Sequence, residues 1–416
     1  MKTNKIAVYF SAATLTMSVA QMITGIVILR WVQPEEMGLW NTINLIQTYG
    51  IFIQLGITNG LNRELPYSLG KGNKNNAIEL VSTALYFNRI CIYVTLFVSV
   101  ICGIYFYFTS GINNFIITFC VVCLILIMFL YQNLLTVTYR TNNSFNSLAT
   151  NYFIQTVFTL ISLPLVYYWN YNGMIVRYLI LGFTTIIIMH YFRPFKINPN
   201  WNTLHFKKLL KTGLPLFSLG YLHGITTTMD RVVLLKFVGM GAVGLYSPSL
   251  AILAVMRMLP KALGTYLYPQ MSYELGKTGD YRKLWGWTWK STVYLFLIFL
   301  PFIVLGIFSI KWIIQSYFPA YIESIDIMKY TLISGLFSGS IVGFNVLNSL
   351  KAFKHITVLY ISKLILNLIL MIIFIKIMKN PICGVAFSLV IADIIYFVGG
   401  LYICYFVLIT KPIKHE

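Results

Sequence analysis

The sequence predicts an all-α polytopic membrane protein with twelve transmembrane helices, in two six-helix parallel-repeat halves around a central cavity. Three observations predict this fold: an apolar composition, regularly spaced apolar windows and an internal repeat. Of the 416 residues, 58% are hydrophobic and 10% are charged, and the mean hydropathy is +0.76. Because a soluble chain carries about 25% charged residues, a cytosolic enzyme or an ordinary globular domain is excluded.

Twelve apolar windows are separated by short polar breaks. Each window approaches the length needed to cross a bilayer core, which takes about 20 apolar residues. With so little chain left outside the bilayer, there is no room for a soluble catalytic domain. In chain order the expected spans are residues 6–29, 39–61, 83–108, 112–137, 148–168, 174–192, 212–238, 244–267, 287–310, 325–350, 354–377 and 382–409.

The basic residues indicate how the spans are oriented. Nineteen Lys and Arg residues fall at one set of span ends and five at the other, and cytoplasmic ends carry the excess. Both termini are therefore expected in the cytoplasm, with the chain embedded among the lipids of a plasma membrane. The net charge of +20 is then mostly a topology signal, and no nucleic-acid partner is expected. The five opposing residues are Arg30, Lys236, Lys311, Lys376 and Lys379.

An internal repeat at an offset of 206 residues relates the two halves of the chain. Residues 28–39 align with 234–245, and Leu69-Gly70-Lys71 aligns with Leu275-Gly276-Lys277 without a gap. Each half has six spans, so the halves should be related by a pseudo-two-fold axis along the membrane normal, with the substrate path between them.

The expected domains are an N-terminal half (1–192), a cytoplasmic linker (193–211) and a C-terminal half (212–416). Within the linker, residues 201–211 mix apolar residues with lysines. Two interpretations of this segment stay open: an interfacial amphipathic helix, or the cytoplasmic start of span 7.

Ionisable residues within the spans are mostly basic. Such groups are costly in a membrane and usually face a cavity or a partner. Their net charge is +5, which suits an anionic cargo, especially a phosphate or diphosphate. Four of the basic residues lie near span ends and can extend to the interface: Arg89, Arg177, Lys261 and Lys329. The others are Arg231, Arg257 and Lys363, and the two acids are Asp230 and Asp393.

Depth distinguishes three of these residues. At about 1.5 Å per residue, Arg257 lies ~20 Å from the outer end of span 8. Lys363 and Asp393 lie at comparable depths on spans 11 and 12, so a simple buried pair is the alternative to a functional role. Asp230 and Arg231 are neighbours on one helix, and we expect their side chains to point to different faces without neutralising each other.

Uncharged polar residues recur along span 2. Asn44, Gln47, Gln54 and Thr58 follow at spacings of three, seven and four, which places them on one helix face. They either line a wet cavity or hydrogen-bond between helices. Cys120 and Cys123 form a C-x-x-C inside an apolar window, with no nearby His or second pair. We interpret them as apolar filling, and no metal or cofactor is expected.

Two segments carry a resemblance to a known family: MDRVVLLKFVGMGAVGLYSPS from Met229, and LGTYLYPQMSYELGKTGD from Leu263. Together with the twelve spans, they resemble the Wzx-type O-antigen and polysaccharide flippases. These belong to the polysaccharide transporter family of the multidrug/oligosaccharidyl-lipid/polysaccharide exporter superfamily. The most specific part is Asp230-Arg231 followed by Lys236, Gly244, Leu245 and Tyr246.

The resemblance implies a flippase that moves an undecaprenyl-diphosphate-linked oligosaccharide from the cytoplasmic to the periplasmic leaflet of a bacterial inner membrane. Alternating access would be driven by a coupling ion, a proton or sodium. A polysaccharide polymerase and a chain-length regulator are candidate assembly partners. The implied ion-coupling residues are Asp230 and Asp393, and the substrate-binding candidates are Arg257, Lys363, Arg231, Arg89, Gln47 and Gln54.

Two rival functions would each require acidic residues at a particular place. A drug/cation antiporter of the same superfamily would line its cavity with acids, against the balance of +5. A membrane glycosyltransferase or polysaccharide polymerase would need carboxylates on a sizeable outer loop. The outer acids Glu35, Glu36, Glu323 and Asp326 lie on short connections instead, so a non-enzymatic transporter is predicted.

Overall fold

The computed structural model describes residues 2–142, 144–278, 280–350 and 352–410, and within these ranges all regular secondary structure is helical. Two compact units are formed: unit 1 from residues 1–32 and 39–225, and unit 2 from residues 33–38 and 226–416. The predicted cytoplasmic C-terminal residues, 411–416, lie outside the described part of the chain.

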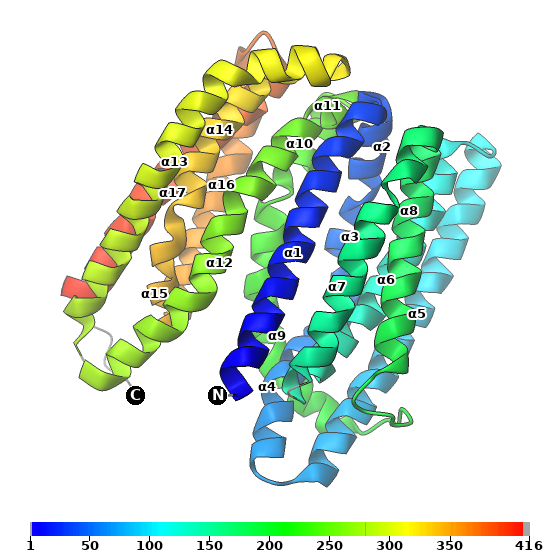
Figure 1. Ribbon diagram of the computed structural model, residues 1–416, viewed down its shortest axis with the longest axis vertical. Coiled ribbons are helices and arrows are strands. Elements are labelled where there is room, and N and C mark those ends of the chain that lie inside the picture. Colours follow the sequence, from blue (N-terminus) through cyan, green and yellow to red (C-terminus); the bar gives the residue numbers. More distant parts are fainter. Residues whose placement is uncertain (1, 143, 279, 351, 411–416) are drawn as a thin grey trace. The chain divides into compact units, whose positions relative to one another are not determined.

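Unit 1 is a helical bundle (Figure 1). Helix α1 packs against α7 and α8, and α6 packs against α5 and α8. Backbone dihedrals at Asn170 (φ 47°, ψ −122°) break α8, so its first turns complete span 5 and the remainder forms span 6. Its elements, with α2 beginning in the unit 2 segment, are α1 (Lys2–Trp31), α2 (Pro34–Ile43), α3 (Leu45–Gly50), η1 (Ile51–Gln54), α4 (Ile57–Gly70), α5 (Lys74–Ser110), α6 (Asn114–Thr141), α7 (Phe145–Ile161), α8 (Leu163–Tyr191) and α9 (Thr203–Thr226).

Unit 2 is a second bundle. Helix α17 packs against α14 and α16, α14 also contacts α12 and α13, and α10 packs against α16. Its elements are α10 (Met229–Phe237), α11 (Met240–Leu245), α12 (Ser247–Thr278), α13 (Tyr281–Tyr317), η2 (Pro319–Ser324), α14 (Ile325–Gly339), η3 (Ile341–Phe344), α15 (Asn345–Ser349), α16 (Phe353–Ile377), α17 (Pro381–Tyr405) and η4 (Phe406–Thr410).

Helices coincide with all twelve expected spans. Nine helical segments of the described chain are long and apolar enough to cross a membrane, which makes this a multi-pass membrane protein. The second, fifth and seventh spans fall outside those nine because each is short, polar or interrupted. Span 2 is broken where Leu55 and Gly56 adopt positive φ values of 47° and 76°, and span 7 is interrupted at Thr227–Thr228.

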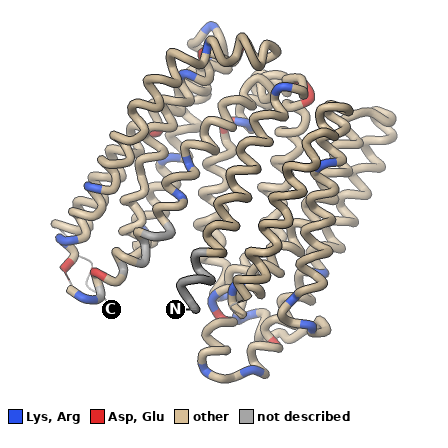
Figure 2. The backbone as a smooth tube through the Cα atoms, in the orientation of Figure 1, with Lys and Arg blue, Asp and Glu red and all other residues tan. Residues whose placement is uncertain are grey.

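Successive spans alternate in direction within each unit. In unit 1, the α4–α5 turn and the segment before α9 lie at one end, and the α5–α6 turn lies at the other (Figure 1). Figure 2 shows Lys and Arg gathered at the first of these ends. The picture for unit 1 therefore agrees with the distribution of basic residues used to assign the cytoplasmic side.

The repeat offset reappears in the element boundaries. Helix α1 ends at Trp31 and α10 at Phe237, 206 residues later, and the next helices begin at Pro34 and Met240, again 206 residues apart. Further along the chain, α5 and α13 each contain 37 residues. The two halves of the sequence thus break and restart their helices at equivalent places.

Two repeat-related glycines pack against each other in unit 2. A Cβ on Gly38 would overlap the carbonyl oxygen of Met240, and a Cβ on Gly244 would overlap that of Pro34. Since Pro34 and Met240 are themselves repeat equivalents, the contact is self-complementary, as in a two-fold interface. Only glycine allows the two backbones to approach this closely.

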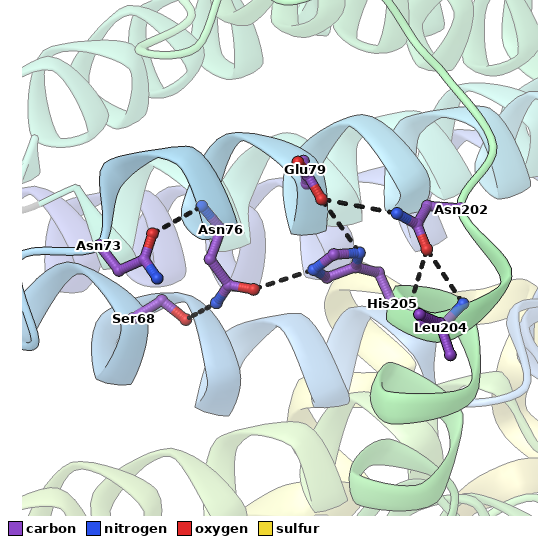
Figure 3. Close-up of polar contacts among 7 residues, drawn as sticks. All are labelled: Ser68, Asn73, Asn76, Glu79, Asn202, Leu204 and His205. Carbon is purple, nitrogen blue, oxygen red and sulfur yellow. Dashed lines mark hydrogen bonds and ion pairs between the residues drawn. The ribbon is translucent and has the colours of Figure 1, made fainter.

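Helix α9 begins at Thr203, which identifies residues 203–211 as the start of span 7, the second of the two interpretations above. Its N-terminal end is fastened to α5 by His205, whose Nδ1 lies 3.4 Å from Glu79 Oε2 and whose Nε2 lies 2.9 Å from Asn76 Oδ1 (Figure 3). Further along, a Cβ on Gly213 would overlap the Gly56 carbonyl oxygen. Because of these contacts α9 belongs to unit 1, so the compact units and the sequence repeats divide the chain differently.

Candidate functional site

Span 7 is interrupted immediately before its acidic residue. Helix α9 ends at Thr226, α10 begins at Met229, and Asp230 lies in the first turn of α10. Asp230 is buried, with 4% of its surface exposed. A carboxylate at this position is stabilised by the unpaired N–H groups of the helix N-terminus. Interrupted helices at membrane depth are typical of ion and substrate sites in transporters.

The expectation that Asp230 and Arg231 do not neutralise each other is wrong. Arg231 Nε lies 3.7 Å from Asp230 Oδ1, and the Arg231 backbone N–H donates to the same oxygen (2.8 Å). Arg231 Nη2 also donates to the Thr227 carbonyl oxygen at 3.2 Å. The long arginine side chain therefore folds back along the helix, which an argument from Cβ directions alone overlooks. Asp230, Arg231 and Arg257 all act electrostatically on the buried Tyr246 hydroxyl.

Arg257 lies on α12, ten residues after Ser247 and so ~15 Å along the helix axis. It is exposed, as is Lys261 one turn later, and neither forms a hydrogen bond or ion pair with the residues the structure describes. Residues four apart share a helix face, so α12 carries two adjacent cations without carboxylate partners. Such a pair on a membrane-spanning helix requires water or an anionic ligand.

Lys363 and Asp393 form a direct ion pair between α16 and α17. The Lys363 Nζ to Asp393 Oδ1 distance is 2.6 Å, and their side chains are 15% and 5% exposed. Ser334 Oγ on α14 donates to Asp393 Oδ2 at 2.5 Å, and Lys363 Nζ lies 4.5 Å from the centre of the Tyr396 ring. The pairing considered from helix depth is therefore present; Ser334 and Tyr396 had no charge signal that would have identified them.

The other basic residues have different environments. Arg177 is expected to extend to the interface, but it is only 3% exposed; its Nη2 donates to the Thr159 carbonyl oxygen at 3.3 Å. Lys329 pairs with Asp326 at 2.8 Å across one turn of α14. Arg89 on α5 is exposed and has no hydrogen bond or ion pair among the described residues. Arg177 is thus a buried cation that the span boundaries did not reveal.

Gln54 and Gln47 have separate roles although they share span 2. Gln54 is 2% exposed and donates to Asn88 Oδ1 (2.8 Å) and the Leu130 carbonyl oxygen (2.9 Å). Its Oε1 accepts a hydrogen bond from Asn133 Nδ2 at 2.9 Å. Gln54 is thus fully engaged in linking helices, the second of the interpretations given for this face.

Gln47 lines a cavity of about 510 Å³ whose walls come entirely from unit 1. Span 2 forms one wall, α6 the second and α9 the third. Sequence reasoning identified Gln47 and Thr58. It missed the residues of α6 and α9, which lie on helices without a polar periodicity, and it missed Asn59 and Asn62, which lie on α4 outside the polar spacing of span 2. The lining residues are Gln47, Thr48, Ile51, Thr58, Asn59, Asn62, Phe129, Asn133, Val137, Arg140, Phe217, Gly220, Tyr221 and Gly224.

These clusters provide two kinds of chemistry. Unit 2 offers two cations on α12 and an ion pair between α16 and α17. Unit 1 offers carboxamide groups, each both a donor and an acceptor. The described cavity lining contains one charged residue, Arg140, and no carboxylate.

Comparison with protein families decides the assignment. Residues 27–319 match the family described as "Polysaccharide biosynthesis protein", which is more than half of the chain. The chain belongs to this family. The resemblance drawn from the residues around Asp230 is thereby confirmed at the family level.

Known relatives extend the comparison over nearly the whole length. The chain is 23% identical over 410 residues to the "Capsular polysaccharide biosynthesis protein CapF" of Staphylococcus aureus, covering 95% of this chain and 97% of that protein. Two solved structures share its fold. One is an inward-facing multidrug resistance MATE family transporter of the MOP superfamily (TM-score 0.75, 13% identity, 95% of each chain). The other is the lipid II flippase MurJ in an inward closed conformation (TM-score 0.69, 16% identity, 95% of this chain and 87% of that one).

Proposed function

We propose that the protein is a flippase that translocates an undecaprenyl-diphosphate-linked oligosaccharide, a repeat unit of an O-antigen, capsule or exopolysaccharide, across a bacterial plasma membrane by alternating access. The observation that carries this proposal is the pair of exposed cations on α12, Arg257 and Lys261, in a membrane protein of the polysaccharide biosynthesis family. A diphosphate cannot enter hydrocarbon without compensation of its charge. The MurJ structure supports a related task for the same fold.

Arg257 is proposed as the principal diphosphate contact. A guanidinium offers a planar set of donors that matches phosphate oxygens, and Lys261 adds a second charge on the same face. Arg231 is a secondary candidate because its guanidinium already contacts Asp230 and the Thr227 carbonyl. Arg89 stays a candidate from its exposure alone.

Lys363 and Asp393 are proposed to couple transport to an ion gradient. While Asp393 is ionised it neutralises Lys363 at 2.6 Å. Protonation of Asp393 would release the ammonium group to an anionic ligand. When the ligand departs, Asp393 would lose that proton to water and the ion pair would form again. Asp230, at the interruption of span 7, is proposed as a second coupling group for a proton or sodium. This mechanism needs no catalytic residue and no cofactor.

The proposed setting follows from the substrate. Both termini would lie in the cytoplasm, where lipid-linked oligosaccharides are assembled. The unit would be delivered to the periplasmic leaflet or its equivalent on the outer side of the membrane. A polymerase and a chain-length regulator are the proposed partners on that side.

Deletion of the gene tests the function directly. The deletion strain should accumulate lipid-linked oligosaccharide on the cytoplasmic leaflet and lose surface polysaccharide. Wild-type protein should restore export, and Arg257→Ala should not, at equal abundance. Lys277→Ala is the matched control, because Lys277 is an exposed cation at the end of the same helix.

The antiporter alternative makes a different forecast. If the deletion leaves lipid-linked oligosaccharide unchanged and the purified protein instead moves the cationic dye ethidium in proteoliposomes, the flippase proposal is wrong. Arg257→Ala restoring export as fully as Lys277→Ala would contradict the assignment of Arg257.

A further inference from the structure

The cavity of unit 1 has a lining unlike that expected for a diphosphate site. Four carboxamide side chains reach it, Gln47, Asn59, Asn62 and Asn133, together with the hydroxyl groups of Thr48 and Thr58. Its volume of about 510 Å³ lies within the range of about 300–1,000 Å³ typical of small-molecule sites. The lining therefore combines uncharged polar groups with apolar side chains and carries a single charged residue, Arg140.

Three of the carboxamides are available to a ligand. Gln47, Asn59 and Asn62 form no side-chain hydrogen bond with the residues the structure describes, whereas Asn133 Nδ2 donates to Gln54 Oε1 and Thr58 Oγ1. Each free carboxamide supplies both donors and an acceptor. Asn59 and Asn62 are three residues apart on α4 and so lie on one face of that helix.

The wall opposite is aromatic and open. On α9 the rings of Phe217 and Tyr221 stack with centroids 5.3 Å apart and an interplanar angle of 25°. Gly220 and Gly224 complete this wall, and a Cβ at either position would meet nothing within 4 Å. The two glycines leave space that any larger residue would fill.

We infer that this cavity is the subsite for the glycan part of the substrate, an inference that rests on the proposed flippase function. Sugar hydroxyls are uncharged donors and acceptors, which carboxamides match without the cost of burying a charge. Apolar sugar faces fit the stacked aromatic wall. Arg140, at the α6 edge of the cavity, is placed to meet an acidic group of the glycan or its phosphate. A hydrophobic cation finds no carboxylate in this lining.

Binding measurements with two probes test the subsite. The first probe is lipid-linked oligosaccharide purified from membranes of the parent strain, and the second is undecaprenyl diphosphate, which has no sugar. With the full-length protein in nanodiscs, Asn59→Ala combined with Asn62→Ala should weaken binding of the first probe about tenfold, since each lost hydrogen bond carries a modest free energy. Binding of the second probe should change less than about twofold on the same scale.

Filling the cavity gives an independent test. Gly220→Leu and Gly224→Leu should each weaken binding of the oligosaccharide probe, and Gly25→Leu should not. Gly25 is a matched control because it lies on α1, also faces open space and does not line the cavity. Thermal unfolding of each variant shows whether it has folded like the wild type.

The outcomes distinguish failure of the subsite from failure of the flippase function. If wild-type protein binds both probes but the carboxamide and glycine variants match it, the subsite is overturned and the flippase function stands. Equal weakening of both probes by the carboxamide variant also overturns the subsite. If the wild-type protein binds neither probe and the deletion accumulates no lipid-linked oligosaccharide, the function fails and the subsite fails with it.

Discussion

The two units differ in the side chains that join their helices. In unit 1 the central hub is Gln54, a neutral side chain that joins three partners by hydrogen bonds. In unit 2 the corresponding role is filled by Asp393, which joins Lys363 and Ser334 through charge. Under the proposed function and the proposed subsite, the two units divide the labour: unit 1 would recognise sugar and unit 2 would handle charge.

The largest expected loss of stability follows from breaking the Lys363–Asp393 ion pair. Asp393→Ala leaves Lys363 without its carboxylate in a poorly exposed site, which should lower the free energy of unfolding by about 3–5 kcal/mol. Asp326→Ala is the control, because it breaks the exposed pair with Lys329 and should cost about 1 kcal/mol or less. Thermal unfolding in detergent measures both changes.

The double change sharpens this prediction. Lys363→Ala with Asp393→Ala should recover stability, since no unpaired charge remains, yet export should stay lost if the pair couples ions. Recovery of export in the double variant would mean that the pair is only structural, and both residues would leave the proposed mechanism.

Replacement of Gln54 should lower the free energy of unfolding by less for each hydrogen-bonding group that loses its partner. Gln54→Leu leaves the Asn88 and Leu130 oxygens without their donor, at about 1–3 kcal/mol for each buried group left unpaired. Gln132→Leu on α6 is the control, because the Gln132 side chain forms no hydrogen bond with the described residues. A Gln54→Leu variant as stable as the control would show that the hydrogen bonds of Gln54 do not stabilise unit 1.

The repeat-related contact in unit 2 should be sensitive to one methyl group. Gly244→Ala forces a Cβ into the Pro34 carbonyl, and overpacking of this kind costs about 1–3 kcal/mol. Gly241→Ala in the same helix meets nothing within 4 Å and should leave the unfolding temperature unchanged. Equal stability of the two variants would show that α11 does not pack on residues 34–38 as described.

The smallest effect is expected at the α9 attachment of unit 1. His205 and Glu79 have side chains 15% and 54% exposed, and a solvent-accessible pair of this kind contributes about 0.2–1 kcal/mol. A double-mutant cycle with His205→Ala and Glu79→Ala measures the coupling. A coupling well above that range would identify the network in Figure 3 as a major determinant of how α9 joins unit 1.

Helices were predictable because apolar length is a property of the sequence itself. The repeat offset of 206 residues reappears in the structure, where α1 ends at Trp31 and α10 at Phe237. The pairing of side chains was harder to predict from the sequence. Arg231 reaches Asp230 because its side chain folds back, and Arg177 is buried by neighbouring helices whose placement no local pattern specifies. The membership of α9 in unit 1 depends on glycine contacts between distant segments, such as Gly56 and Gly213.

The cavity illustrates the same limit. Span 2 showed its polar face through the spacing of Gln47 and Thr58, but Asn133 and Arg140 lie on an otherwise apolar helix. With Phe129 and Val137 they follow spacings of four, four and three, so the four residues share one face of α6. That this face lines a cavity is evident only from the helices that form the other walls. Asn59 and Asn62 reach the cavity because the backbone break at Leu55–Gly56 redirects the chain into α4.

The division of labour is tested most directly by one set of dissociation constants. Two variants, Arg257→Ala with Lys261→Ala and Asn59→Ala with Asn62→Ala, are each measured against undecaprenyl diphosphate and against the lipid-linked oligosaccharide. We predict that the charge variant loses about tenfold or more in affinity for both probes, because both carry the diphosphate. The carboxamide variant should lose affinity for the oligosaccharide alone. If both variants weaken both probes to the same degree, or if the charge variant leaves both unchanged, the two units do not divide recognition in this way.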